Sequence, residues 1–193
     1  MKLNVKEIFY SLQGEGGRAG EASIFIRLTK CNLDCSFCDT DFAEGEDMSL
    51  DEILDTIRQY PSKWIIWTGG EPTLQLKDEH LHFFKDKGYK QAIETNGTKP
   101  VSDLIDYITC SPKRNYERIK QYLPKVNEIR LPIGIEDKLP DIETLPLADK
   151  YFLSPIFDGD TLNQTNVKYC VELIKDNPQW ILSLQIHKLI HIE

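Results

Sequence analysis

Short apolar runs rich in β-branched residues alternate along the chain with segments of helical spacing. The runs are too short for helices, and turn residues bound them, so they predict strands that are mostly buried. The predicted strands are residues 22–28, 64–68, 91–95, 107–110, 127–131, 150–154 and 180–185.

Helices are predicted between several of these strands. Apolar residues within 50–57 recur at i, i+3, i+4 and i+7, and Ser49 with Glu52 three positions later forms a capping box in front of them. Residues 78–87 and 167–174 predict two further helices, the first of which ends before Gly88. The segment after Ser102 carries a shorter and weaker helical pattern.

Alternation of strands with helices predicts an α/β protein whose parallel strands are joined by right-handed crossovers. A chain of 193 residues can bury one sizeable core, so we expect one domain over residues 1–193. A complete eight-unit barrel needs about 250 residues, whereas an incomplete (βα)6-type barrel, compact with reduced helices, fits this length. Its ligand site is expected at the carboxyl ends of the strands.

Composition narrows the class of partner. Lys and Arg number 23 against 31 Asp and Glu, a net charge of −8, and no basic cluster is present, which argues against nucleic acid. There is neither a signal-peptide pattern nor an apolar run of about 18 residues, so we expect a cytoplasmic protein with no membrane segment. A small molecule is the expected partner.

Three of the five cysteines, Cys31, Cys35 and Cys38, have the spacing C-x3-C-x2-C in the loop after the first predicted strand. Cys110 and Cys170 are isolated among apolar residues and are expected in the core. A structural zinc site or an iron–sulfur electron carrier usually takes four protein ligands. Three thiolates would leave one iron of a [4Fe–4S] cluster open to a small molecule. A zinc site or a plain electron-transfer cluster remains the alternative.

Polar, glycine-containing motifs follow three successive predicted strands. They are Thr68-Gly69-Gly70-Glu71-Pro72, Glu94-Thr95-Asn96-Gly97 and Ser111-Pro112-Lys113. Each by itself is ordinary turn chemistry. Together they are what a ligand lying across the mouth of a barrel requires, because paired glycines let the backbone approach and a carboxylate suits an ammonium group.

The cysteine motif, with Phe37 just before its third cysteine, resembles the defining motif of the radical S-adenosylmethionine (SAM) superfamily, and the resemblance covers nearly the whole chain. It implies a [4Fe–4S] cluster on the three cysteines, with SAM chelating the open iron. No side chain is then assigned as catalytic, because a 5′-deoxyadenosyl radical from SAM abstracts the hydrogen. The SAM-binding residues implied are Phe37, Cys38, Asp39, Gly69, Gly70, Glu71, Glu94, Ser111, Pro112, Lys113, Ser154 and Pro155.

Four segments together resemble the 7-carboxy-7-deazaguanine synthase family: Ile8-Phe9-Tyr10-Ser11-Leu12-Gln13-Gly14-Glu15-Gly16, Arg27, Cys38-Asp39-Thr40 and Leu184-Gln185-Ile186-His187-Lys188. The resemblance implies a SAM- and Mg²⁺-dependent ring contraction of 6-carboxy-5,6,7,8-tetrahydropterin to 7-carboxy-7-deazaguanine, with loss of ammonia, in queuosine and deazapurine biosynthesis. It also implies a homodimer and a reductant such as flavodoxin or ferredoxin.

The same resemblance assigns a substrate site and a Mg²⁺ ligand, Thr40. Amide and carboxylate groups suit the donor and acceptor edge of a pterin, and an arginine suits its carboxylate. The ordinary alternatives are a glycine turn for 13–16, a surface ion pair for Arg27, a structural role for His187 and a turn for Thr40. The implied substrate residues are Leu12, Gln13, Gly14, Glu15, Arg27, Thr68, His187 and Glu193.

Two other functions are compatible with the cysteine motif. A glycyl-radical-enzyme activase is another compact radical SAM protein, although the motifs at the two ends of the chain disfavour it. A non-catalytic iron–sulfur or zinc-binding module is the second alternative. The sequence leaves open the electron donor, the oligomeric state, the pathway branch and the SAM contacts after the sixth strand.

Overall fold

The computed structural model describes residues 1–35, 38, 44–113, 115–135 and 137–192. The chain divides into two compact units, each described here by itself. The first unit comprises Met1–Ser11, Ala22–Thr95 and Pro100–Ile108, and the second comprises Leu12–Glu21, Asn96–Lys99 and Thr109–Glu193. A single domain over residues 1–193 stays a prediction.

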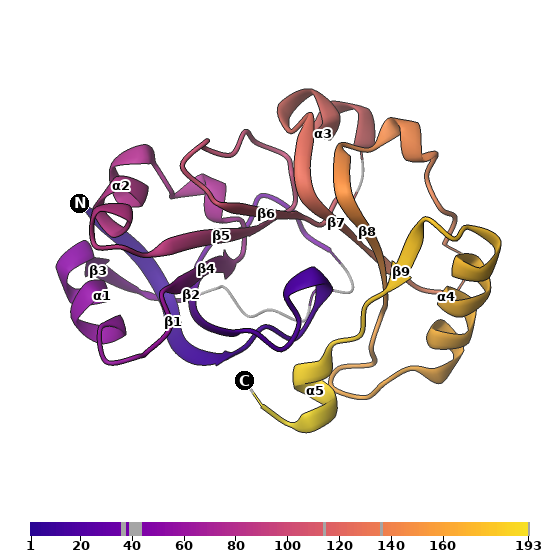
Figure 1. The fold of residues 1–193 in the computed structure, drawn as a ribbon, viewed down its shortest axis with the longest axis horizontal. Coiled ribbons are helices and arrows are strands. Elements are labelled where there is room, and N and C mark those ends of the chain that lie inside the picture. The colour runs from indigo at the N-terminus through magenta and orange to yellow at the C-terminus, as the bar shows by residue number, and fades with distance from the viewer. Residues whose placement is uncertain (36–37, 39–43, 114, 136, 193) are drawn as a thin grey trace. The chain divides into compact units, whose positions relative to one another are not determined.

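The first unit is a sheet of strand order β3-β1-β2-β4-β5 with helices on one face (Figure 1). Its central strands β2, β4 and β5 are parallel, whereas β1 and β3 pair antiparallel. The elements are β1 (Lys2–Leu12), β2 (Ala22–Leu28), β3 (Glu46–Ser49), α1 (Leu50–Ile57), β4 (Trp64–Gly69), the 3₁₀ helix η2 (Pro72–Leu74), α2 (Asp78–Asp86) and β5 (Lys90–Thr95).

The period of two along these strands separates the faces of the sheet. Ile24, Ile26 and Trp67 are buried in a core with residues of α1 and α2, such as Ile53 and Phe84. The other face carries Phe25, Ile66 and Ala92, against which partly buried aromatic side chains pack, and among the described residues this cluster includes none from a helix.

The start of α1 is a capping box, as the sequence predicts. The Ser49 hydroxyl accepts the Glu52 N–H at 3.3 Å, and the Glu52 carboxylate accepts the Ser49 N–H at 2.7 Å. Because these bonds satisfy backbone donors at the helix terminus, an eight-residue helix can form there.

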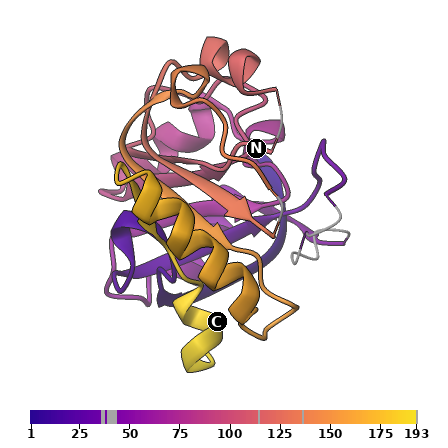
Figure 2. The same ribbon diagram turned by 90° about the vertical axis from the view of Figure 1, so that its right-hand side faces the viewer.

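The second unit contains the parallel strands β7, β8 and β9 in that order, with α4 packed against β8 and β9 (Figure 2). Thr109 and Cys110 at the end of β6 (Tyr107–Cys110) pair with β7. The remaining elements are η1 (Gly16–Arg18), α3 (Tyr116–Tyr122), β7 (Lys125–Ile133), η3 (Ile142–Thr144), β8 (Leu147–Pro155), α4 (Gln164–Asp176), β9 (Trp180–Leu182) and α5 (Ile186–Ile190).

All seven predicted strands and all three predicted helices are present. The last strand is shorter than predicted. β9 ends at Leu182, and residues 183–185 do not belong to the strand. His187 lies in α5, whereas the sequence run containing it has an alternating character. A helix of five residues is shorter than the window over which helical spacing is recognised.

Cys110 and Cys170 are in the core as predicted, each 0% exposed. Burial raises the pKa of the Cys170 thiol to about 12. Neither therefore competes as an accessible metal ligand. Across the residues described, no helix combines the length and the apolar character needed to cross a membrane.

Candidate active site

Three of the residues assigned to ligands share the helix-free face of the first unit. Arg27 follows Phe25 by two positions, Thr68 follows Ile66 and Glu94 follows Ala92, so the alternation puts all three on that face. Arg27 and Thr68 are directly opposite in the parallel register. The carboxyl ends of three neighbouring strands thus present an arginine, a hydroxyl and a carboxylate side by side.

Arg27 is held by two neighbours from β1. Its Nε donates to the Glu7 carboxylate at 2.6 Å, and its guanidinium carbon lies 5.5 Å from the centroid of the Phe9 ring. Phe9 in turn stacks on Phe25 at 4.8 Å. The ion pair that the sequence offers as the ordinary alternative is therefore present, and it fixes the guanidinium with a quarter of the side chain exposed.

The cysteine loop begins directly after β2. Cys31 and Cys35 are half-buried, Cys38 is exposed, and none of the three forms a disulfide. Burial raises the pKa of the Cys31 thiol, against a hydrogen bond from the Leu33 N–H, and Glu71, Cys35 and Cys38 raise it further through their charge. In the part of the chain that is described, no set of three His, Cys, Asp or Glu side chains is arranged to hold a metal ion.

Gly69, which ends β4, and Gly70 after it are required by the backbone that leads into the cysteine loop. Gly70 donates to the Leu28 carbonyl at 3.0 Å, and a Cβ on it would overlap the Lys30 carbonyl. Gly69 has a φ of +117° and lies just as close to Leu28. Only glycine lets these two segments approach, so the motif fixes the base of the cysteine loop whether or not it also contacts a ligand.

Glu71, the carboxylate of this motif, is 0% exposed. Its Oε1 accepts from the Thr73 hydroxyl at 2.6 Å, the Thr73 N–H at 3.1 Å and the Thr95 hydroxyl at 2.8 Å. The side chain therefore caps η2 and links it to β5. Binding of the SAM amino group by Glu71 stays a prediction beside this structural role.

The motifs from the two ends of the chain meet within the second unit. The Ile186 N–H donates to the Gly14 carbonyl at 2.9 Å, and the His187 ring packs so closely on Gly14 that a Cβ there would overlap it. The loop itself closes through the Gln13 N–H, which donates to the Glu21 carbonyl at 2.9 Å. Residues assigned to substrate from opposite ends of the sequence, Gln13, Gly14 and His187, thus form one cluster.

Gly14→Ala is expected to weaken binding of the carboxypterin about tenfold or more, because the new methyl must displace the His187 ring, and overpacking of this kind costs about 1–3 kcal/mol. The matched control is Gly134→Ala, where a Cβ would first meet Asp137 at 3.4 Å. Calorimetric titration of both variants with the pterin measures the difference. Equal affinity in Gly14→Ala and wild type would contradict the placement of His187.

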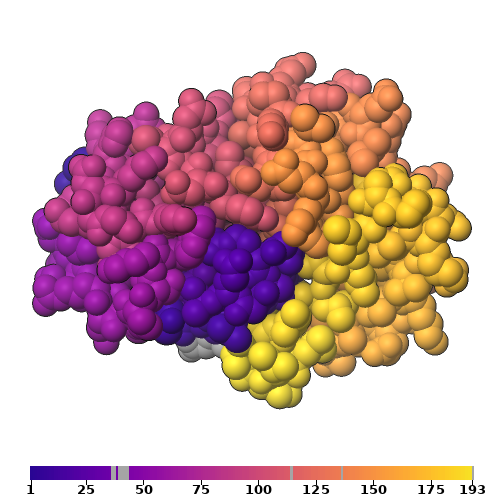
Figure 3. All heavy atoms as spheres, in the orientation of Figure 1, coloured from indigo at the N-terminus to yellow at the C-terminus, as the bar shows by residue number. Residues whose placement is uncertain are grey.

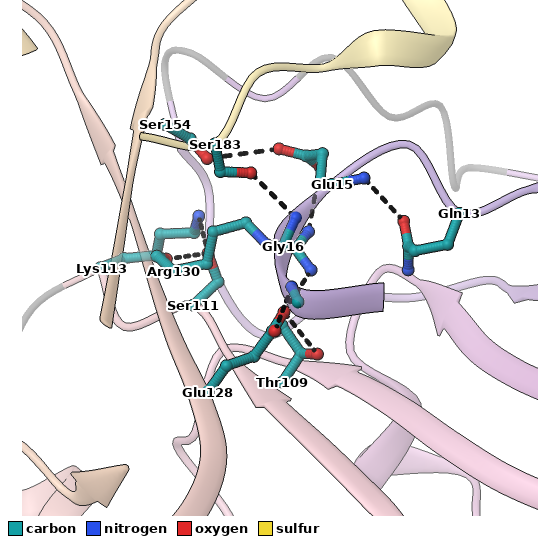
Figure 4. Close-up of polar contacts among 11 residues, drawn as sticks. Gln13, Glu15, Gly16, Thr109, Ser111, Lys113, Glu128, Arg130, Ser154 and Ser183 are labelled. Carbon is teal, nitrogen blue, oxygen red and sulfur yellow. Dashed lines mark hydrogen bonds and ion pairs between the residues drawn. The ribbon is translucent and has the colours of Figure 1, made fainter. Parts of the chain in front are cut away.

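Glu15 is held by an ion-pair network that the sequence analysis did not identify (Figure 4). Nη1 of Arg130 donates to Oε2 of Glu15 at 3.0 Å, and Nη2 donates to Oε1 of Glu128 at 2.8 Å. Glu128 also accepts the Thr109 hydroxyl at 3.1 Å and the Gly17 N–H at 2.7 Å. The side chains of Glu128 and Arg130 are 1% and 6% exposed.

A signal for this pair was present in the sequence. Glu128 and Arg130 both fall within the run 127–131, which predicts a buried strand. A buried charge is costly unless it is paired, so two opposite charges at i and i+2 on one strand face indicate an internal ion pair. The sequence could not indicate the third partner, Glu15, which lies 115 positions away from Arg130.

The motif after β6 is tied to the same network. The Ser111 hydroxyl donates to the Arg130 carbonyl at 2.7 Å, and Lys113 donates to Ser111 at 3.1 Å. Ser154, assigned to SAM by resemblance, has its hydroxyl 3.4 Å from Oε1 of Glu15, a residue assigned to substrate. Figure 4 shows Arg130 from β7 and Ser154 from β8 bonded to Glu15, with Ser111 and Lys113 from the loop after β6 linked to the backbone of Arg130.

The remaining assigned residues are placed without such contacts or fall outside the description. Leu12 ends β1 and is 39% exposed, while Pro112 and Pro155 are buried at the ends of their strands. Four assignments lie outside the described residues: Phe37, Asp39, Thr40 and Glu193.

Comparison with known proteins identifies the family. The model of the radical SAM superfamily matches residues 25–136. A 7-carboxy-7-deazaguanine synthase from Bacteroides thetaiotaomicron is 40% identical over 192 residues, covering 100% of both chains. One from Haemophilus influenzae is 44% identical over 205 residues, covering 99% of this chain and 94% of that one.

The crystal structure of QueE from Escherichia coli matches with a TM-score of 0.75 and 25% identity, over 97% of this chain and 95% of that chain. This confirms the predicted α/β radical SAM fold with reduced helices. The chain therefore belongs to the radical SAM superfamily and, within it, to the 7-carboxy-7-deazaguanine synthase family.

Proposed function

We propose that this protein converts 6-carboxy-5,6,7,8-tetrahydropterin to 7-carboxy-7-deazaguanine, with loss of ammonia. The observation that carries the proposal is the meeting of Gly14 with Ile186 and His187, because it joins the two terminal motifs of the family into one cluster. Relatives at 40% and 44% identity that bear the synthase name support it along the whole chain.

Membership of the radical SAM superfamily implies a [4Fe–4S] cluster and SAM. The chemistry of the donors fits an iron–sulfur cluster, since Cys31, Cys35 and Cys38 form no disulfide and are at least partly accessible, while the other two cysteines are buried. When bound, the cluster and SAM supply a carbon radical that abstracts hydrogen from the substrate. The work left to the chain is binding, orientation and exclusion of water.

In this proposal different side chains bind different parts of the substrate. Gln13 and Glu15 read the donor and acceptor edge of the pterin, His187 contacts it from α5, and Arg27 binds its carboxylate. The support for Glu15 is its fixed position beside Arg130, and the support for Arg27 is its place on the helix-free face at the end of β2. Hydrogen abstraction from one carbon demands such exact placement.

Mg²⁺ is a further part of the proposal, with Thr40 as a ligand. A hydroxyl is an acceptable ligand for this hard ion, which takes few protein oxygens and keeps several waters. Thr40→Ala and Thr40→Val are expected to need more Mg²⁺ for half-maximal turnover, with cluster content and SAM affinity unchanged. Turnover titrated with Mg²⁺ measures this, and a response identical to wild type in both variants would rule Thr40 out.

A homodimer, a cytoplasmic location and a flavodoxin- or ferredoxin-like reductant remain predictions. The C-terminal segment, yellow in Figure 3, lies at the surface and exposes Ile186, Leu189, Ile190 and Ile192 by 38–52%. Exposed apolar side chains grouped in this way are typical of a surface that a partner covers. That grouping supports the expectation of a homodimer.

The deciding experiment is anaerobic incubation of the reconstituted protein with the carboxypterin, SAM, Mg²⁺ and a reductant, followed by product identification. We expect 7-carboxy-7-deazaguanine to form with SAM recycled. SAM consumed with the pterin untouched would instead favour a glycyl-radical-enzyme activase. No iron and no SAM binding would favour a non-catalytic module.

A further inference from the structure

We propose that Arg130, anchored by Glu128, is a positioning residue that fixes the carboxylate of Glu15 for recognition of the pterin ring. The inference rests on the proposed function, because it concerns how that substrate is held. It assigns a role to Glu128 and Arg130, two buried charged residues on β7 that lie outside all the motifs identified in the sequence.

The first support is the geometry of the guanidinium. Its two Nη atoms bond different carboxylates, Oε2 of Glu15 at 3.0 Å and Oε1 of Glu128 at 2.8 Å. The Arg130 side chain is 6% exposed, so its guanidinium cannot reorient to follow Glu15 without disrupting the packing around it. A guanidinium fixed in this way sets the position of the Glu15 carboxylate oxygen that it binds.

The second support is that Glu128 also binds the backbone of the loop that carries Glu15. Its Oε2 accepts the Gly17 N–H at 2.7 Å, while the Thr109 hydroxyl donates to its Oε1 at 3.1 Å. Gly16 lies between Glu15 and Gly17 in this loop. It has a φ of +69°, and a Cβ there would overlap the Glu128 carboxylate. The loop is therefore bound to β7 at both its backbone and its Glu15 side chain.

The third support is charge. Glu15, Glu128 and Arg130 place two carboxylates around one cation, so each carboxylate accepts a charge-assisted hydrogen bond from the guanidinium. The pyrimidinone edge of a pterin presents neighbouring N–H donors, which an ionised carboxylate accepts and a protonated one does not match. Arg130 thus holds the Glu15 carboxylate in position to accept from this edge of the pterin, and Arg130 itself does not contact the substrate.

A double-mutant cycle tests the proposal. The variants are Arg130→Met, Glu15→Gln and the combination, with Arg118→Met on exposed α3 as the arginine control. The probes are 6-carboxy-5,6,7,8-tetrahydropterin and SAM, titrated anaerobically into the cluster-loaded protein. Because Arg130 acts through Glu15, we expect each single variant to lose about ten- to a hundredfold in pterin affinity and the double variant to lose no more than the larger single loss.

SAM affinity is expected to stay within about twofold in all variants, and Arg118→Met to match wild type. Additive losses in the cycle, or an equal loss of SAM affinity, would overturn the positioning role. Wild type that fails to bind the pterin would instead overturn the proposed function together with the inference. If Arg130→Met does not fold, Arg130→Lys and Glu128→Gln carry the same cycle, because both keep the site filled and weaken the fork.

Discussion

Cys31→Ala, Cys35→Ala and Cys38→Ala are each expected to abolish reductive cleavage of SAM, because three thiolates are the fewest that hold a [4Fe–4S] cluster with one iron open to SAM. The three thiols form no disulfide and are at least partly accessible in the loop that follows β2. Loss of one leaves a cluster with too few protein ligands, so no partial activity is expected. Anaerobic reconstitution, iron and sulfide analysis and release of 5′-deoxyadenosine measure the effect.

The matched controls are Cys110→Ala and Cys170→Ala. Both thiols are 0% exposed, so neither is accessible as a cluster ligand, and burial also raises the pKa of the Cys170 thiol to about 12. Removing a buried thiol leaves a small cavity, so these variants are expected to lose stability but to keep SAM cleavage. SAM cleavage retained in any of the first three variants would refute the cluster assignment.

Arg27→Ala is expected to weaken pterin binding by one to two decades. A charge-assisted hydrogen-bond pair to a carboxylate contributes about 1.5–3 kcal/mol, which corresponds to that loss of affinity. Arg27→Lys is expected to recover only part of it, because an ammonium keeps the charge and loses the planar fork that Glu7 and Phe9 now orient. SAM affinity is expected to change little.

Paired titrations of wild type and the variants with SAM and with the carboxypterin measure this division of labour. Arg58→Ala is the control, since Arg58 makes a comparable but exposed ion pair with Asp55 beside α1. The Arg27–Glu7 pair is itself partly exposed, so its loss is expected to change stability by about 1 kcal/mol or less. Weaker SAM binding with unchanged pterin affinity in Arg27→Ala would show that Arg27 serves the cofactor instead.

Local patterns were sufficient for most of the elements. β2 and β4 are short continuous apolar runs because residues on both of their faces are buried, and the α1 capping box involves residues three positions apart. Such signals lie within one element and survive in the sequence alone. β1 and β3 were absent from the predicted strands. For β3 the reason is that it has only four residues and forms through pairing with β1.

The motifs at the two ends of the chain determined the family, and the cysteine spacing determined the class of cofactor that the family implies. Neither could show that Gly14 lies against His187, because that contact joins residues over 170 positions apart. Only the packing of α5 on the 12–21 loop reveals it. The same packing explains why this position is glycine: the approach leaves no space for a Cβ.

The sequence by itself determined most of the strands and the three longest helices, the buried cysteines and the residues that carry the family motifs, because each depends on local spacing or on side-chain chemistry. Tertiary structure alone decided that Arg130 and Glu128 hold the Glu15 loop, and that Gly69 and Gly70 fix the base of the cysteine loop. An ion pair or a close backbone approach depends on distance in space. Where the partners are far apart along the chain, as Glu15 and Arg130 are, spacing carries no signal of the contact, whereas Glu128 and Arg130 lie two positions apart and do leave one.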